Sequence, residues 1–486
     1  MQYKNWTIPL VLFLCAGICT PLLAQEKPWL SFPFETRVKR SIEHFARSRG
    51  IPSISFSFFG EQEEAFDFTT GYADMDRRIA ATPEHLYTLA SVTKPVTAMT
   101  MLNLVHQNRV SLDDSASKFI ENFPEGITIA DLLNHTSGLR RENENEHHLT
   151  NSSYRDVVNY LPRKFKNKKH RYANINYAAI GAIIEKITGR PFREVAADYF
   201  VSITGDSLYF YNYQQEKSDH LFVKYYVKKG RRRYPHRPVS FGMWEPAALA
   251  QSTASALAKF VKYHLNPEFT SYLEKHAVYS RGYAGKSGME AYEKYALGFR
   301  LRYKNKKLIS IYHNGFIYGV ISTVCYFPEK RAGFAILANM STYPRRKLSL
   351  FGLSHTIARQ LAEAYTTRMA HCAAVNSVEY ALRVYSDSLD IMQPRGYVLK
   401  KIGNDLLKNG EKEKAFSVLH LANALFPEEW GTYERLAEAY LLKGDLNLAR
   451  SIVANGAEAD SLSARRSKIF QTMEGFGSRA GASQLR

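Results

Sequence analysis

Strand-like runs occur near both ends of the first 340 residues of this chain, and helical patterns fill the region between them. The early runs, 51–59 and 65–72, are joined by the polar turn Gly60–Glu63. The late runs are joined by short turns and cover 295–303, 307–313, 319–327 and 333–339. Because strands bury their apolar faces by pairing, we expect one antiparallel sheet closed by both ends of this segment. The helices between them would form a second lobe.

A second, helical region follows from about Asn376. It contains a repeat of 34 residues, in which small residues recur at Gly403 and Ala437, and at Ala415 and Ala449. This period resembles that of tetratricopeptide repeats. Two units are visible, and flanking helices at 378–391 and 464–473 are expected as caps. An ordinary helical appendage is the alternative.

Length and composition agree with two domains. The 486 residues exceed one ordinary domain, and an apolar content of 45% excludes global disorder. We expect a signal peptide at 1–24, a first folded domain at 30–365 and a helical repeat domain at 376–475. Residues 205–250 have no clear pattern and are interpreted as an elaborated lid.

The N-terminus has the features of an export signal. Lys4 precedes a mostly apolar run from Trp6 to Leu23, and we expect cleavage after Ala24. The protein would then be periplasmic or secreted, with an uncleaved membrane anchor as the alternative. Outside this segment only Cys325 and Cys372 remain, either as buried thiols or as one disulfide.

The formal net charge is +19, with basic runs at 164–171, 228–233 and 302–307. A solvated basic surface and attraction to an anionic cell envelope both account for this charge. Nucleic acid is not expected as a partner, because the chain has no motif for binding it. No Cys/His cluster has zinc-like spacing, and we expect neither a metal nor a cofactor.

Ser91 and Lys94 form a Ser-x-x-Lys motif at the predicted start of a helix. Residues three apart lie on one helix face, so the amine would lie beside the hydroxyl. A serine needs a base to become a nucleophile, and burial can lower the pKa of a lysine from its free value of about 10.4. The spacing alone is weak, because Ser115 and Lys118 repeat it in a polar segment that we interpret as solvated surface.

Two further motifs follow in the chain. Tyr172 and Asn174 lie in a predicted extended segment, where residues two apart face the same side. A phenol beside an ammonium group can exchange a proton with the serine or the leaving group, and the amide can hold the lysine and a substrate carbonyl. His313 and Gly315 end a predicted strand, and the N–H of Phe316 after them would suit an oxyanion.

Between the first two motifs, residues 127–139 predict a short helix that runs into a hydroxyl-rich turn. A purely structural role is as plausible for this turn as a functional one. A histidine on a strand, such as His313, is also more often structural than functional when it stands alone. His313 does not stand alone, however, because it follows the two earlier motifs along the chain, and this order favours a functional role.

The order Ser-x-x-Lys, Tyr-x-Asn, His-x-Gly resembles the penicillin-recognising serine hydrolases, particularly class C β-lactamases, D,D-peptidases and related esterases. The resemblance covers roughly residues 36–345. It implies an α+β fold, with an antiparallel sheet flanked by helices plus a helical lobe, followed here by an all-α tetratricopeptide-like domain. It also implies an acylated Ser91 with Lys94 and Tyr172 as catalytic partners. The implied substrate-binding residues are Asn174, His313, Gly315 and Phe316, with the amides of Ser91 and Phe316 as the oxyanion hole.

The sequence departs from this family at two positions. Many relatives begin the third motif with lysine, a permanent cation that suits a substrate carboxylate. His313 is largely neutral at pH 7 if its pKa is near the ordinary value of about 6.5. Val320 stands after Gly319, where an aromatic residue is expected. The substrate therefore stays open among a small ester, a peptide and a β-lactam-like compound.

The leading hypothesis is an exported serine hydrolase that cleaves an ester or amide bond through a Ser91 acyl-enzyme. The alternative is a sensor or scaffold that recognises cell-wall fragments, acylates slowly or not at all, and recruits a protein partner through its helical repeats. A steady-state hydrolysis assay separates the two hypotheses.

Overall fold

A computed structural model describes residues 34–61, 64–139, 169–211, 221–237, 242–284, 290–343, 349–385 and 394–459. The expected signal peptide and the expected cap at 464–473 lie outside these residues. The described residues form two compact units. Val38–Ile357 is one, and the segments up to Arg37 and from Ala358 onward form the other.

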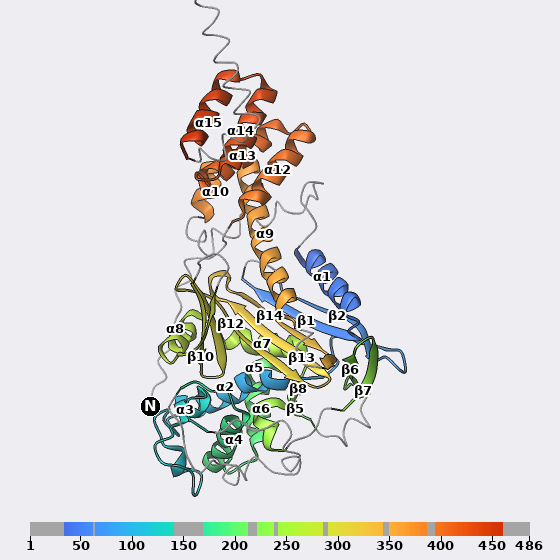
Figure 1. The fold of residues 1–486 in the computed structure, drawn as a ribbon, viewed down its shortest axis with the longest axis vertical. Helices are drawn as coiled ribbons and strands as arrows, with labels where there is room; N and C mark the ends of the chain where they lie inside the picture. Colours follow the sequence, from blue (N-terminus) through green and yellow to red (C-terminus); the bar gives the residue numbers. More distant parts are fainter. Residues whose placement is uncertain are drawn as a thin grey trace, which may run out of the picture. The chain divides into compact units, whose positions relative to one another are not determined.

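A nine-stranded antiparallel sheet organises the first unit, in the order β3-β2-β1-β14-β13-β12-β11-β10-β9 (Figure 1). Its strands are β1 (Ser53–Gly60), β2 (Phe66–Asp74), β3 (Ile79–Ala80), β9 (Val278–Ala284), β10 (Glu290–Ala296), β11 (Phe299–Lys304), β12 (Lys307–Ile317), β13 (Val320–Phe327) and β14 (Ala332–Ala338). Strand β1 pairs with β14 from Ile54 to Gly60. The early and late strands therefore join in one sheet, as predicted.

The central strands are covered on both faces. Every residue of β13 and β14 is buried, and so are seven of the eight residues of β1. Helix α7 (Ala254–His264) packs against all three of these strands. Burial on both faces explains why β13 and β14 read as mostly apolar runs. Strand β1 instead alternates serine with Ile54, Phe56 and Phe58, and the small serines are buried as well.

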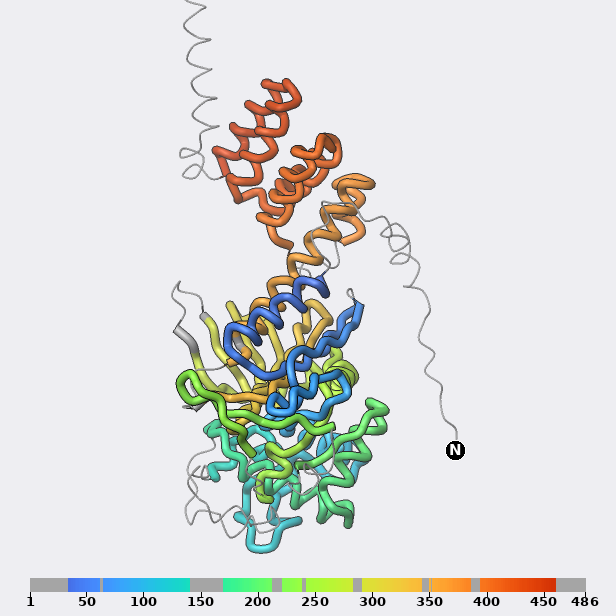
Figure 2. Tube along the Cα trace, turned by 90° about the vertical axis from the view of Figure 1, so that its right-hand side faces the viewer, coloured from blue at the N-terminus to red at the C-terminus, as the bar shows by residue number. Residues whose placement is uncertain are grey.

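The helical lobe lies at one end of this unit, where Figures 1 and 2 show the segments coloured from cyan to green. Besides α7 it contains α2 (Thr93–His106), α3 (Ile129–Leu133), α4 (Asn174–Thr188), α5 (Phe192–Thr204), α6 (Glu245–Ala248), α8 (Pro267–Lys275) and the 3-10 helices η2 (Ala90–Val92), η3 (Ala116–Lys118) and η7 (Gly242–Trp244). Ten of the fourteen residues of α2 are buried. Because α2 is buried in the middle of the lobe, the residues at its N-terminus are held in place by packing on all sides.

Residues 205–250, which have no clear sequence pattern, contribute strands to two small sheets. One has the order β4-β8-β5 (Tyr87–Thr88, Ala250–Ser252 and Tyr209–Phe210), and the other has the order β15-β6-β7 (Met340–Tyr343, Tyr225–Lys229 and Arg232–His236). The same segment supplies α6, which contacts η2, α2 and α4. It therefore carries part of the wall around Ser91.

One predicted strand is wrong. Residues 295–303 are not a single strand, because the chain turns at Leu297 and Gly298 between β10 and β11. Leu297 has a φ of 43° and Gly298 a φ of 95°, both in the left-handed region. A Cβ at Gly298 would also lie 2.8 Å from the Cβ of Ala98, so glycine lets this turn pack on α2. The sequence pattern also missed β9.

The second unit contains helices that pair along the chain. Helix α1 (Phe34–Arg49) crosses the boundary between the units after Arg37, and the long α9 (Phe351–Val375) crosses it after Ile357. Helix α9 is followed by α10 (Val378–Tyr385), α12 (Gly396–Lys408), α13 (Lys412–Leu425), α14 (Trp430–Lys443) and α15 (Leu446–Ala459). Helix α12 packs on α13, and α14 packs on α15. The helical C-terminal region is confirmed, although helix begins at Phe351 rather than near Asn376.

Small residues mark the positions where these helices cross. A Cβ at Gly403 would come within 2.6 Å of the Leu419 side chain. Ala415, Ala437 and Ala449 are fully buried. The paired small positions of the 34-residue period are thus contact positions between helices.

Cys325 and Cys372 are both buried and both free, so they form no disulfide. Among the described residues, no helix combines the length and apolar character needed to span a membrane. The same residues contain no cluster of three or more His, Cys, Asp or Glu side chains arranged to hold a metal ion.

Candidate active site

Ser91 lies on η2, immediately before α2 begins at Thr93. The preceding residue, Ala90, is buried and has a φ of 47°, in the left-handed region that a non-glycine residue rarely adopts. This conformation costs roughly 1–2 kcal/mol and requires support from the surrounding structure. Ser322 on β13 gives that support by donating a hydrogen bond to the carbonyl of Leu89, at 2.5 Å.

Lys94 is fully buried, and its amine lies beside the hydroxyl of Ser91. The Nζ–Oγ distance is 3.4 Å. Nζ also donates to the side-chain oxygen of Asn174 at 2.7 Å and to the carbonyl of Ala247 at 2.9 Å. These two oxygens can only accept, so they take two N–H groups of the amine. In the neutral amine the remaining position, which faces Ser91, is a lone pair that can accept a proton.

The second Ser-x-x-Lys sequence forms no such pair. Lys118 is 62% exposed and pairs with Asp114, while Ser115 hydrogen-bonds to Ser117. The prediction of solvated surface is therefore confirmed. The two motifs differ in burial, which the spacing alone does not specify.

Tyr172 and Asn174 both contact the Lys94 amine, one through its ring and the other through its amide. Nζ lies 4.8 Å from the centroid of the Tyr172 ring. Asn174 is the first residue of α4, while Tyr172 lies two residues before that helix. Both side chains therefore face the same amine, as their spacing predicts. The hydroxyl of Tyr172 is buried and has no hydrogen-bond partner among the described residues.

Strand β12 brings the third motif against η2. A Cβ at Gly315 would lie 2.0 Å from the Ser322 hydroxyl, 2.5 Å from the Leu89 carbonyl and 3.0 Å from the Ala90 Cβ. No other residue fits there, so Gly315 allows the strand to lie directly beside the Ser91 segment. The register with β11 ends at Tyr312, and β12 continues past it through His313 to Phe316.

His313 is buried and neutral. Burial is the main cause that lowers its pKa well below the ordinary value, and the charges of Arg300 and Lys94 lower it further. Its Nδ1 lies 3.0 Å from the carbonyl of Asn314, which can only accept, so Nδ1 carries the proton. Nε2 then accepts from the hydroxyl of Tyr295, at 3.2 Å. His313 therefore supplies no fixed positive charge.

His135 is a member of the site whose role the sequence left undecided. Its ring centroid lies 4.4 Å from that of Tyr172 and 4.9 Å from that of Tyr295. Its Nδ1 accepts from the amide nitrogen of Asn176, at 2.9 Å. Burial, followed by the charge of Lys94, lowers the pKa of His135 well below the ordinary value. The only sequence signal was its place in the hydroxyl-rich turn at 127–139.

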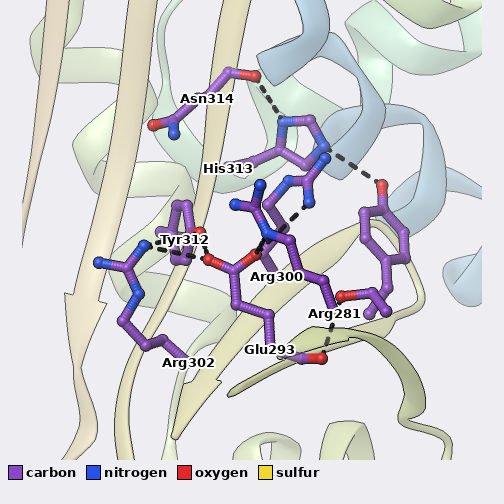
Figure 3. Close-up of polar contacts among 9 residues, drawn as sticks. Arg281, Glu293, Arg300, Arg302, Tyr312, His313 and Asn314 are labelled. Atoms are coloured by element: carbon purple, nitrogen blue, oxygen red, sulfur yellow. Dashed lines mark hydrogen bonds and ion pairs between the residues drawn. The ribbon is translucent and has the colours of Figure 1, made fainter. Parts of the chain in front are cut away.

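A buried carboxylate organises the strands beside this group. Glu293 on β10 accepts hydrogen bonds from Arg281 at 2.6 Å, from Arg302 at 3.0 Å and from the Tyr312 hydroxyl. Figure 3 shows these side chains gathered around the carboxylate, beside His313. Burial acts to raise the pKa of Glu293, but these hydrogen bonds and the charge of Arg281 lower it to about 2. The carboxylate ties β9, β10, β11 and β12 together.

Comparison with known proteins assigns the first unit. The sequence profile of the beta-lactamase family matches residues 38–353. Protein flp of Staphylococcus aureus (strain MW2) is 23% identical over 378 residues, which cover 74% of this chain and 71% of that protein. The solved structure of D-amino acid amidase from Ochrobactrum anthropi SV3 has a TM-score of 0.55 at 20% identity, and the match covers 68% of this chain and 97% of that one. A class C beta-lactamase has a TM-score of 0.54 at 15% identity, with 68% and 98% covered.

The solved structures share the fold of this unit, and the family profile spans more than half of the chain. The matched range contains Ser91, Lys94, Tyr172, Asn174 and His313. The chain therefore belongs to the beta-lactamase family of serine hydrolases.

Proposed function

We propose that this protein is an exported hydrolase that cleaves an ester or amide bond through an acyl-enzyme on Ser91. The observation that carries the proposal is the buried Lys94 amine, 3.4 Å from the Ser91 hydroxyl and held by two acceptors. A serine hydroxyl becomes a useful nucleophile when a positioned base removes its proton. Lys94 is the base that meets this requirement.

The reaction follows from this geometry. Ser91 Oγ attacks the substrate carbonyl carbon while its proton passes to Lys94 Nζ. The resulting oxyanion is stabilised by the amides of Ser91 and Phe316, on two segments that Gly315 allows to lie side by side. The bond to the leaving group then breaks, and the departing amine or alkoxide takes up a proton. Water attacks the acyl-enzyme in the second half-reaction and releases the acid.

Tyr172 is proposed as the proton shuttle to the leaving group. Its ring contacts the Lys94 amine, and its hydroxyl is free of other partners among the described residues. A shuttle needs a hydroxyl that is not committed to a structural hydrogen bond. Tyr172→Phe should keep the ring contact and slow acylation, whereas Tyr295→Phe serves as a control on a neighbouring phenol that is hydrogen-bonded to His313.

The bond that is cut would be an amide bond or a β-lactam bond, as the names of two structural relatives suggest, or a simple ester bond. A panel of a chromogenic cephalosporin, a short-chain nitrophenyl ester and a D-alanyl-D-alanine peptide tests these three classes directly. Turnover of any member supports the hydrolase, and its loss in Ser91→Ala assigns the turnover to this site. Acylation without turnover would instead favour the sensor or scaffold.

Export and partner binding complete the proposal. Removal of residues 1–24 would leave a mature protein that begins at Gln25, which N-terminal sequencing of the exported protein tests. The basic surface would favour an anionic cell envelope. The paired C-terminal helices would act as a tetratricopeptide-like repeat domain that binds a protein partner, and deletion of 376–486 should then abolish partner binding while a small substrate is still hydrolysed.

A further inference from the structure

His135 has a backbone conformation that its own side chain disfavours. It directly follows Asn134, which caps the end of α3, and its φ of 57° lies in the left-handed region. Glycine is the usual residue at this position after a helix, because any Cβ is strained there. The turn alone would be served better by glycine. A buried histidine at this position therefore indicates that its side chain has a use elsewhere in the site.

That side chain contacts the segment that carries Tyr172. The carbonyl of His135 accepts a hydrogen bond from the N–H of Arg171 at 2.8 Å, and its Nδ1 accepts one from the N–H of Ala173 at 3.3 Å. These two N–H groups flank Tyr172, whose ring centroid lies 4.4 Å from that of the imidazole. One residue therefore holds the backbone on both sides of the phenol and packs against the phenol itself.

The imidazole of His135 has one tautomer in this contact. A backbone N–H can only donate, so Nδ1 carries no proton and Nε2 carries it. The amide nitrogen of Asn176 donates to the same Nδ1 at 2.9 Å, while its amide oxygen accepts from the hydroxyl of Ser137 at 2.6 Å. Burial is the main cause that lowers the pKa of His135 well below the ordinary value, so Nδ1 stays an acceptor at pH 7.

The phenol held in this way has no hydrogen bond of its own to fix it. The Tyr172 hydroxyl is buried and forms no hydrogen bond within the described part of the chain, although the Lys94 amine lies 4.8 Å from the ring centroid. The neighbouring rings of Tyr295 and His313 are 6.2 and 6.1 Å away, farther than the imidazole of His135. The position of this hydroxyl therefore depends on the backbone and on the closest ring contact.

We propose that His135 is a positioning residue, whose neutral imidazole places the Tyr172 hydroxyl for proton transfer to the leaving group. The proposal rests on the proposed hydrolase and on its Tyr172 proton shuttle. In that transfer the bond from the carbonyl carbon to the leaving atom breaks, and the phenol proton passes to the leaving atom. The Lys94 ammonium, which holds the proton taken from Ser91, then returns a proton to the phenol. The proposal gives the turn at 127–139 a function.

Two butyrate esters with different leaving groups test this role. The nitrophenoxide of 4-nitrophenyl butyrate leaves without a proton, whereas the strongly basic alkoxide of 2,2,2-trifluoroethyl butyrate needs one. Both esters form the same acyl-enzyme, so kcat/KM compares only the acylation steps. His135→Gly suits the left-handed backbone and should lower kcat/KM for the trifluoroethyl ester by about 10- to 100-fold, the range for a misplaced catalytic group. The loss on the nitrophenyl ester should be smaller, about threefold or less.

Three further variants separate positioning from stability. His135→Asn also tolerates the left-handed backbone and should show the same selective loss in smaller measure. In a Tyr172→Phe background, His135→Gly should add about twofold or less, because the hydroxyl that it positions is absent. Thr136→Val is the matched control, since it removes a hydrogen bond to Asp131 from the same turn, and it should affect both esters equally. Added imidazole should restore part of the trifluoroethyl ester rate in His135→Gly.

An equal loss on both esters in His135→Gly, or a full further loss on top of Tyr172→Phe, would overturn the proposal. Exchange of the Ala173 amide hydrogen, measured in Ser91→Ala with and without His135→Gly, gives a readout that needs no turnover. It should become about tenfold faster, or more, once the Nδ1 acceptor is removed. Failure of the wild type to hydrolyse either ester would contradict the hydrolase, while faster exchange in His135→Gly would still support the contact that positions Tyr172.

Discussion

At the scale of single residues, the amide of Asn174 has the most direct control over the Lys94 amine. It accepts a 2.7 Å hydrogen bond from Nζ, across 80 residues of sequence. The amide and the Ala247 carbonyl together orient the third position of the amine toward Ser91.

Replacing Asn174 with alanine should therefore slow acylation of Ser91 by about 2- to 10-fold, because the amine loses one of the two acceptors that orient its lone pair toward Ser91. The rate of fluorophosphonate labelling measures the effect. Asn103→Ala on α2 is the control, since that side chain forms no hydrogen bond within the described residues. An unchanged rate in Asn174→Ala would show that the amine is held without this amide.

Gly315 determines how closely β12 approaches the Ser91 segment. Alanine there would place Cβ 2.0 Å from the Ser322 hydroxyl and 2.5 Å from the Leu89 carbonyl, so strand or turn must move. We expect Gly315→Ala to reduce Ser91 labelling by at least tenfold. Gly352→Ala, where an added Cβ meets nothing within 4 Å, should leave labelling unchanged. Equal labelling in both variants would contradict the close approach.

At the scale of elements, Glu293 holds four neighbouring strands through one carboxylate. Its pKa lies at about 2 in the folded protein, below the ordinary 4.5. A lowered carboxyl pKa contributes stability that is complete above pH 4.5 and is lost as the pH falls toward 2. The β9–β12 part of the sheet should therefore weaken in acid.

Glu293→Gln should lower the free energy of unfolding by about 3 kcal/mol at pH 7, because three arginines lose a buried partner. It should also remove the corresponding pH dependence between 4.5 and 2. Urea unfolding at several pH values measures both effects. Glu121→Gln, at an exposed position, is the control. Stability within 0.5 kcal/mol of the wild type, taken as the usual range for surface substitutions, would contradict this role.

The single sheet shared by the early and late strands was predictable, and so were the residue pairs of the first two motifs, because alternation, turn residues and spacing are local signals. The turn at Leu297–Gly298 was not, since its positive φ values depend on packing against α2. His135 and Glu293 were also not identified, because their surroundings come from distant segments. A buried carboxylate with three arginines has no signature in a single sequence.

At the scale of the whole molecule, the chain forms two compact units. Their cores are built differently. The first surrounds a nine-stranded sheet, and the second consists of helices that cross at small residues such as Gly403.

Overpacking one unit should leave the chemistry of the other intact. Gly403→Val would push a side chain into Leu419 and should destabilise the packing of the C-terminal helices by about 1–3 kcal/mol. Labelling of Ser91 should stay within twofold of the wild type. Gly431→Ala is the control, because its Cβ would meet only the far end of the long Lys400 side chain, which can shift without moving the backbone. Loss of labelling in Gly403→Val alone would show that the site depends on the C-terminal helices.

The most direct test of the whole account is the site of acylation. A fluorophosphonate probe followed by peptide mass mapping should place the adduct on Ser91. Ser91→Ala should abolish labelling, Lys94→Met should slow it by at least a hundredfold, and Ser115→Ala, in the second Ser-x-x-Lys sequence, should leave it unchanged. An adduct on another residue, or undiminished labelling of Ser91→Ala, would contradict the assignment of Ser91 as the nucleophile.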